Sequence, residues 1–150
     1  MEEQKSLARL QRLCSKAEYC RSDIRRKALK DMEGNADAAA RIVASLVEDR
    51  YVDDARYAAA FAREKANIQG WGPIKIRFQL RAKGVSEEDI SAALEEVEPS
   101  KAEDKLDRLL AAKAKTLEGD PQKRLKLLKF GLSRGYAYDA VEASLARIQK

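Results

Sequence analysis

The sequence predicts an all-α protein of three consecutive three-helix repeats, and composition and glycine spacing together lead to this prediction. Of the 150 residues, 45% are hydrophobic and 37% are charged, a balance typical of helical proteins. Seven glycines and three prolines supply too few turns for a β-sheet protein. Gly34, Gly84 and Gly135 each follow an apolar-periodic segment and lie 50 and 51 residues apart. We therefore expect repeats at residues 1–50, 51–98 and 99–150, placed in a row.

Helical periodicity and capping residues place three helices in the first repeat. Leu7, Leu10 and Cys14 recur at the spacing of one helix face. Ser22 is expected to cap the second helix and Asp37 the third, because short polar side chains accept hydrogen bonds from the free N–H groups of a first turn.

The second repeat has clearer helix boundaries. Asp53 or Asp54 is expected to cap its first helix, where two acidic groups also complement the helix dipole. Pro73 suits the first position of the next helix, directly after the break at Gly70-Trp71-Gly72. Ser86 is expected to cap the third helix.

The third repeat follows the same plan. Ser100 and Glu103 have the spacing of a capping box, which predicts a helix start at this point. Gly119-Asp120-Pro121 is expected to end this helix and begin another. Gly84 and Gly135 are expected to end the middle helices of their repeats in a left-handed conformation and to carry no chemistry.

The middle helices of the second and third repeats have apolar residues on two sides. At 100° per residue, Ile74 and Phe78 form one stripe, and Ile76 and Leu80 form another nearly opposite. The helix near residues 123–134 repeats this arrangement, with Leu125, Leu128 and Leu132 on one side and Leu127 and Phe130 on another. This pattern predicts helices that are covered on both sides.

The amino-acid inventory excludes most catalytic chemistry. The chain has no histidine, so no Ser-His-Asp or Cys-His arrangement and no histidine-ligated metal site can form. We expect a protein that is not an enzyme and uses no metal or cofactor. Cys14 and Cys20 match no zinc or redox spacing and predict reduced, packing cysteines in a cytoplasmic protein. No apolar run is long enough to span a membrane, so no membrane association is expected.

Basic residues are concentrated in the first and last parts of the chain. Residues 1–34 hold nine basic and six acidic side chains, and residues 99–150 hold twelve and seven, whereas the segment between them is net acidic. This pattern favours an anionic partner. The candidate partner-binding residues are the basic side chains of the middle helices together with one tryptophan: Arg77, Arg81, Lys123, Arg124, Lys126, Lys129, Arg134 and Trp71.

Each of these candidates has a simpler structural interpretation. Charged residues on a helix often form only a solvated face. Trp71 lies between two glycines, where it could be a packing anchor or a stacking platform for a base. Eight further motif residues are interpreted as structural: Asp53, Asp54, Arg56, Tyr57, Gly72, Pro73, Gly84 and Gly135.

Three segments in order resemble one known family. The runs are Tyr51-Val52-Asp53-Asp54-Ala55-Arg56-Tyr57-Ala58, Gly70-Trp71-Gly72-Pro73-Ile74-Lys75-Ile76-Arg77 and Leu80-Arg81-Ala82-Lys83-Gly84-Val85. Together they resemble the central motif of the RecX regulatory proteins, and Ser133-Arg134-Gly135-Tyr136 is similar to that family's arginine-glycine-aromatic ending. Arg50 stands where the family commonly has a glycine before the aromatic residue.

The resemblance implies a fold and a function. RecX proteins are tandem three-helix repeats with an elongated, curved body, and they bind the filament that the RecA recombinase forms on DNA. The resemblance therefore implies inhibition of RecA ATPase, recombinase and strand-exchange activity, with effects on DNA repair and the SOS response. A monomer with the RecA filament, and with single-stranded DNA, as partners is expected. The alternative is a general single-stranded nucleic-acid-binding helical protein without a RecA-specific role.

Overall fold

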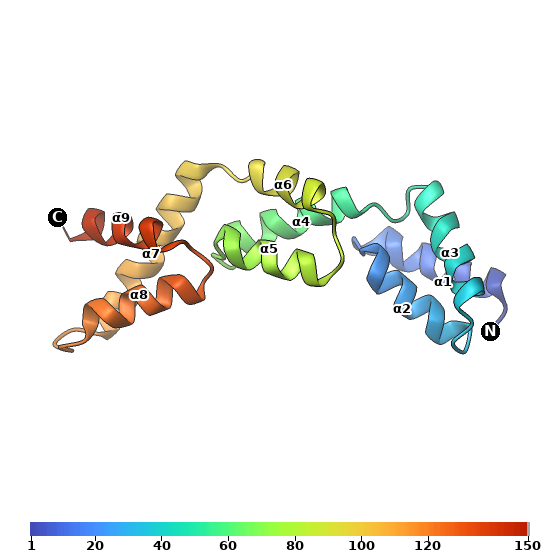
Figure 1. Cartoon of the computed structure of the whole chain (residues 1–150), viewed down its shortest axis with the longest axis horizontal. Coiled ribbons are helices and arrows are strands. Elements are labelled where there is room, and N and C mark those ends of the chain that lie inside the picture. Colours follow the sequence, from blue (N-terminus) through green and yellow to red (C-terminus); the bar gives the residue numbers. More distant parts are fainter. Residues whose placement is uncertain (150) are drawn as a thin grey trace. The chain divides into compact units, whose positions relative to one another are not determined.

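The computed structural model describes residues 1–149, and over that range it contains nine helices and no strand, which confirms the all-α prediction. They follow the chain in three sets of three (Figure 1). Their bounds are α1 Glu3–Lys16, α2 Arg21–Asp31, α3 Ala36–Glu48, α4 Asp54–Asn67, α5 Pro73–Ala82, α6 Glu87–Glu95, α7 Pro99–Thr116, α8 Lys123–Ser133 and α9 Tyr138–Ile148.

The chain forms two compact units whose boundaries pass through the middle set of helices. The first unit comprises residues 1–60 and 80–92, and the second comprises residues 61–79 and 93–150. Helices α4, α5 and α6 each begin in one unit and end in the other. The three-repeat boundaries and the elongated, curved arrangement stay predictions from the sequence.

The first unit has its core where α1, α2 and α3 pack against one another. Leu10, Ile24 and Leu46 are fully buried at its centre, and Val52 extends the core beyond α3. Cys14 packs against this core, whereas Cys20 is fully buried just before α2. Both cysteines are free thiols, and burial raises the pKa of each.

The second unit has a core of the same kind between α7, α8 and α9. Leu106, Leu110 and Leu145 are buried there, and Tyr136 closes one end. Burial at these positions follows the helical spacing of the apolar residues, as expected for amphipathic helices.

Three predicted caps are wrong, and the structure gives a cause for each. Asn35, not Asp37, accepts a hydrogen bond from the Ala38 N–H (3.1 Å), so Asp37 lies within the first turn of α3. Helix α2 starts at Arg21, and the Ser22 hydroxyl instead donates to the Lys83 carbonyl (2.6 Å).

The predicted capping box in the third repeat is also absent. Helix α7 begins at Pro99, because proline fits the first helical position, and this start places Ser100 inside the helix. The preceding residue, Glu98, occupies the N-cap position, and its side chain makes no capping hydrogen bond. By contrast, Ser86 caps α6 as predicted, by accepting from the Asp89 N–H (3.2 Å).

The prediction that the middle helices are covered on both sides is wrong. Ile76 and Leu80 of α5 are buried, but Ile74 and Phe78 on its other stripe are 56% and 68% exposed. In α8, Leu127 is buried and Phe130 packs against the core.

The opposite stripe of α8 is also largely open to solvent. Leu125 and Leu132 are 48% and 45% exposed, although Leu128 between them packs against the core. Periodicity predicts two apolar stripes on each helix. It does not indicate which of the two stripes is buried against another element.

Candidate functional site

The acidic pair in the Tyr51–Ala58 motif caps two different helices of the first unit. The Asp53 carboxylate accepts from the Arg56 N–H (3.1 Å) at the start of α4. The Asp54 carboxylate accepts from the N–H of Arg21 (2.8 Å), the first residue of α2. Asp54 therefore supplies an acceptor for the first N–H group of α2.

Arg56 joins the loops around this pair. Its guanidinium donates to the Glu18 carboxylate (2.5 Å) and to the carbonyls of Arg50 (3.1 Å) and Tyr51 (3.3 Å). Tyr57 is half-buried beside it, and loss of hydration raises the pKa of its phenol to about 12. The charged side chains of this motif therefore have their hydrogen-bond partners within the fold.

A second contact in the first unit joins α2 to the segment after α5. The Lys83 ammonium lies 3.0 Å from one Asp23 carboxylate oxygen and 3.2 Å from the other. Burial alone raises the pKa of Asp23, but hydrogen bonds from Lys83 and Cys20 more than offset it, so the pKa lies below its usual value.

In the second unit, the loop before α5 packs directly on the loop after α8. The Gly72 N–H donates to the Arg134 carbonyl (2.7 Å), and the Ile74 N–H donates to the Gly135 carbonyl (3.0 Å). The α8–α9 loop therefore supplies acceptors for the free N–H groups at the start of α5.

Two glycines make this approach possible. A Cβ added at Gly72 would lie 2.4 Å from the Gly135 carbonyl oxygen, and one added at Gly135 would lie 2.3 Å from the Lys75 Cβ. Gly135 also has a φ of +95°, in the left-handed region. The glycines of both motifs are thus required by backbone contact.

Trp71 is held beside this contact by cations. The Lys75 ammonium lies 4.4 Å from its ring centroid and the Lys65 ammonium 5.0 Å, while Phe61 meets it edge to face at 6.1 Å. Trp71 is half-buried, so the packing interpretation accounts for its position.

The two candidate arginines of α5 lie in different surroundings. Arg81 is exposed and forms an ion pair with Glu87, which raises its pKa. Arg77 is half-buried one turn earlier and also has an interaction within the protein. Their side chains share the face that i and i+4 residues occupy on a helix.

The candidate basic residues of α8 divide into paired and unpaired groups. Arg124 lies 2.6 Å from the Glu142 carboxylate and Lys126 lies 2.5 Å from the Asp120 carboxylate, so both have acidic partners. The Lys126 hydrogen bond lowers the pKa of Asp120. The side chains of Lys123 and Lys129 form no ion pair within residues 1–149.

Arg134, the last candidate, lies over an aromatic ring. Its guanidinium carbon is 5.1 Å from the Phe130 ring centroid, and the Lys113 ammonium lies 5.5 Å from the same ring. Arg134 is half-buried, and its carbonyl accepts from Gly72 as described above.

Four apolar residues that were predicted to be covered are exposed in the structure and join the candidate binding residues. Ile74 and Phe78 are exposed on α5, and Leu125 and Leu132 on the equivalent helix α8. Exposed aliphatic and aromatic side chains grouped with basic ones are typical of protein-binding surfaces. Their two-sided periodicity was visible in the sequence, but their exposure was not.

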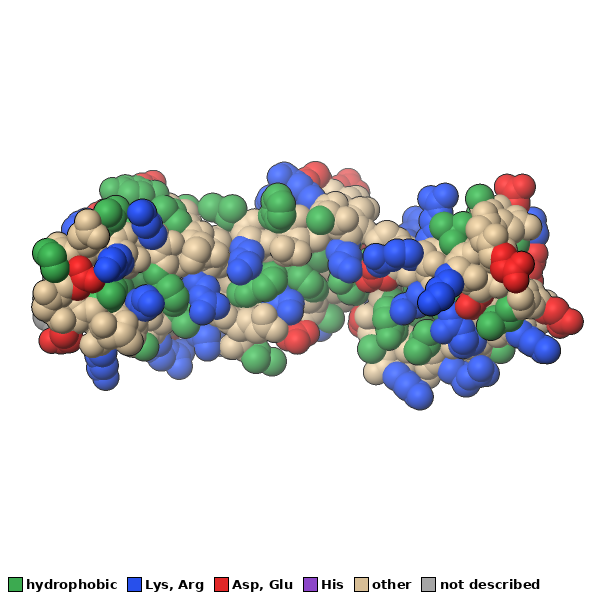
Figure 2. All heavy atoms as spheres, turned by 90° about the horizontal axis from the view of Figure 1, so that it is seen from below, with side chains coloured by type: hydrophobic (Ala, Val, Ile, Leu, Met, Phe, Trp, Pro, Cys, Tyr) green, Lys and Arg blue, Asp and Glu red, His purple; other side chains and the backbone are tan. Residues whose placement is uncertain are grey.

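Figure 2 shows how these side-chain types mix on one face of the second unit. In the left and central part of that view, hydrophobic side chains lie between Lys and Arg side chains, with few acidic ones among them. We call the residues Ile74, Arg77, Phe78, Leu125, Lys126, Lys129 and Leu132 the mixed set; they come from α5 and α8 of the second unit.

Neither a metal cluster nor a membrane span is present in the described part of the chain. Residues 1–149 contain no group of three or more acidic or cysteine side chains arranged to hold a metal ion. No helix in that range is both long and apolar enough to cross a bilayer. The arrangement is suited to binding through basic and apolar side chains.

Comparison with known proteins finds relatives that are similar to this chain over most of its length. The family model for the second three-helix domain of RecX matches residues 53–94. Regulatory protein RecX of Salmonella paratyphi A is 28% identical over 113 residues, covering 75% of this chain and 68% of that protein. Regulatory protein RecX of Bacillus mycoides is 28% identical over 123 residues, covering 81% of this chain and 46% of that protein.

Solved structures agree with these matches. A crystal structure of regulatory protein RecX has a TM-score of 0.84 at 26% identity and covers 93% of this chain and 70% of its own. The crystal structure of RecX from Lactobacillus salivarius shares the fold, with a TM-score of 0.86 at 21% identity over 98% of this chain and 96% of its own. In both sequence and fold, the chain is therefore similar to the regulatory protein RecX.

Proposed function

We propose that this protein binds the filament of RecA on DNA and inhibits RecA ATPase, recombinase and strand-exchange activity. It would thereby moderate DNA repair and the SOS response in the cytoplasm, acting by stoichiometric binding and without catalysis. Similarity to regulatory proteins named RecX supports the proposal.

The observation that carries the proposal is the mixed set on α5 and α8. Phe78 is 68% exposed one turn after Ile74, and basic residues adjoin both on the same helix. Equivalent apolar and basic residues recur on α8. A filament of protein on DNA offers phosphate groups and protein surface together, which a ligand with both side-chain types can engage.

Binding preference separates this function from its alternative. We expect the protein to bind RecA-coated single-stranded DNA more tightly than the same DNA alone, as measured by fluorescence anisotropy at several salt concentrations. A general nucleic-acid-binding protein would bind both equally well, with a steep salt dependence set by its phosphate contacts.

Charge-reversed variants test where the binding takes place. We expect Arg77→Glu, Arg81→Glu, Lys126→Glu and Lys129→Glu, combined in one chain, to weaken filament binding while helical content stays unchanged. A matched control reverses four exposed basic residues elsewhere, namely Arg12, Lys16, Arg25 and Lys115. Equal binding by the two fourfold variants would contradict the assignment of the surface.

A further inference from the structure

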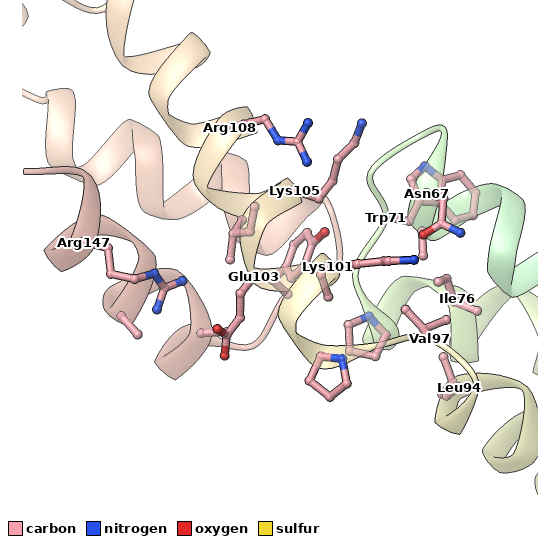
Figure 3. Close-up of a pocket in the computed structure, with 18 residues that line it drawn as sticks. Asn67, Trp71, Ile76, Leu94, Val97, Lys101, Glu103, Lys105, Arg108 and Arg147 are labelled. Carbon is pink, nitrogen blue, oxygen red and sulfur yellow. The ribbon is translucent and has the colours of Figure 1, made fainter.

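The second unit contains a cavity that the proposed filament surface does not use. Its volume is about 620 Å³, and it lies between α7, α9, the Trp71 loop and the end of α6 (Figure 3). The lining is mainly aliphatic and includes Ile76, Leu94, Val97 and Leu106. A cavity of this size and character accepts a large apolar side chain.

Cations surround the apolar lining. Lys101, Lys105 and Arg108 follow one another along one side of α7, and Figure 3 shows the Lys101 side chain directed toward the side of the cavity where Asn67 and Trp71 lie. Glu103 is the one carboxylate among the lining residues in the described chain.

Of the four lining cations, only Lys101 and Arg147 form ion pairs within residues 1–149. Arg147 also lines the cavity, but it is paired with Asp107 at 2.9 Å. The Lys101 ammonium lies 3.9 Å from Glu98, a loose pair in which both side chains are more than half exposed. Such a pair contributes little, so the rim remains available to an external anion.

The aromatic side chains at the cavity do not favour a nucleic-acid base. Trp71 already has two lysine ammonium groups against its ring, as described above. Tyr136 is 5% exposed, and its hydroxyl donates to the Gly70 carbonyl (3.2 Å). Base stacking needs an open aromatic face, whereas an aliphatic lining suits a protein side chain.

We propose that this cavity binds an acidic segment of a partner protein, with one large apolar side chain inserted and carboxylates flanking it on the rim. The apolar side chain would contact Ile76, Val97 and Leu106, and the carboxylates would face Lys101, Lys105 and Arg108. The chemistry of the cavity defines the partner class, so the inference stands whether or not RecA is the protein that supplies the segment.

Peptide display tests the chemistry directly, because it imposes no ligand in advance. A random dodecapeptide library is selected against the full chain, with counter-selection against Ala102→Phe, which fills the cavity from α7. We expect enriched peptides to carry Phe, Leu or Ile between Asp or Glu residues. Enrichment of basic or uncharged peptides, or no enrichment, would overturn the proposal.

Trp71, the single tryptophan of the chain, reports entry into the cavity. We expect the selected peptide to change the fluorescence emission of Trp71. We expect Lys101→Glu to weaken binding of the peptide about tenfold, because the variant loses a positive charge at the rim and repels the acidic peptide. Lys115→Glu, on the same helix but outside the lining, is the matched control and should bind like the parent. Equal binding by both variants would contradict the rim assignment.

A single-stranded oligonucleotide completes the test. Oligothymidylate of twelve nucleotides is titrated under the same conditions, with circular dichroism confirming that each variant is folded. We expect no change in Trp71 emission that depends on Lys101 or Ala102. An oligonucleotide response that these two substitutions abolish would show that the cavity takes nucleic acid instead, and would overturn the proposal.

Discussion

At the scale of single residues, two of the left-handed glycines in the second unit have different surroundings. Gly119 has a φ of +79° and open space where a Cβ would lie, whereas a Cβ at Gly135 would lie 2.7 Å from the Lys75 backbone nitrogen. Alanine at Gly119 therefore suffers backbone strain alone, while alanine at Gly135 also displaces the loop from α5.

We expect Gly119→Ala to lower the free energy of unfolding by about 1 kcal/mol and Gly135→Ala by about 2–4 kcal/mol. Urea unfolding followed by far-ultraviolet circular dichroism measures both values. Gly84, which also has open space at a φ of +78°, should behave like Gly119. Equal losses at Gly119 and Gly135 would mean that the contact with Lys75 does not constrain the fold.

Arg50 offers a prediction in the opposite direction. It follows the end of α3 with a φ of +61°, a conformation that costs a non-glycine residue about 1–2 kcal/mol. Arg50→Gly should therefore raise the free energy of unfolding by about 0.5–1 kcal/mol, after allowance for the greater freedom of glycine in the unfolded chain. Asp49→Gly, at a φ of −85°, is the control and should destabilise; a loss of stability in Arg50→Gly would contradict this account.

The capping roles of Asp53 and Ser86 were predictable because their partners are local. Asp53 and Ser86 cap the helices that directly follow them, so their spacing in the sequence was sufficient. Asp54 caps α2, which lies 33 residues earlier in the chain, and no local pattern indicates such a contact. Ser22 was assigned wrongly for the same reason, since Asp54 takes the capping role next to it.

At the scale of elements, the two apolar stripes of α5 differ in exposure, and substitutions can measure how much each stripe contributes to stability. Ile76 is 1% exposed and Phe78 is 68% exposed, although periodicity gives both the same weight. We expect Ile76→Ala to cost about 2–4 kcal/mol of unfolding free energy and Phe78→Ala to change it by less than about 0.5 kcal/mol. Similar losses in urea unfolding would show that the Phe78 stripe is covered.

The same comparison shows which features of the fold can be predicted from the sequence. Helix number, helix type and one buried face of α5 and α8 follow from periodicity, because amphipathic patterns reflect burial. The exposed stripe could not be identified, since its composition is that of a buried one. The candidate basic residues were found, but their pairing with Glu142, Asp120 and Glu87 depends on tertiary contacts.

At the scale of the whole molecule, charge and apolar exposure point to one kind of activity. The chain carries a formal net charge of +5 and no histidine, and its basic residues concentrate near both ends. Long-range attraction of this kind speeds association with an anionic partner and weakens as salt is added. Exposed apolar residues add contacts that salt does not screen, which suits a partner containing both DNA and protein.

DNA-dependent ATP hydrolysis by the cognate RecA, measured with increasing amounts of this protein, tests the central claim most directly. We expect hydrolysis to fall as the protein approaches a stoichiometric ratio to RecA, and the fourfold Glu variant of Arg77, Arg81, Lys126 and Lys129 to inhibit less in step with its weaker binding. An unchanged hydrolysis rate at a stoichiometric excess of the folded parent protein would contradict the proposed function.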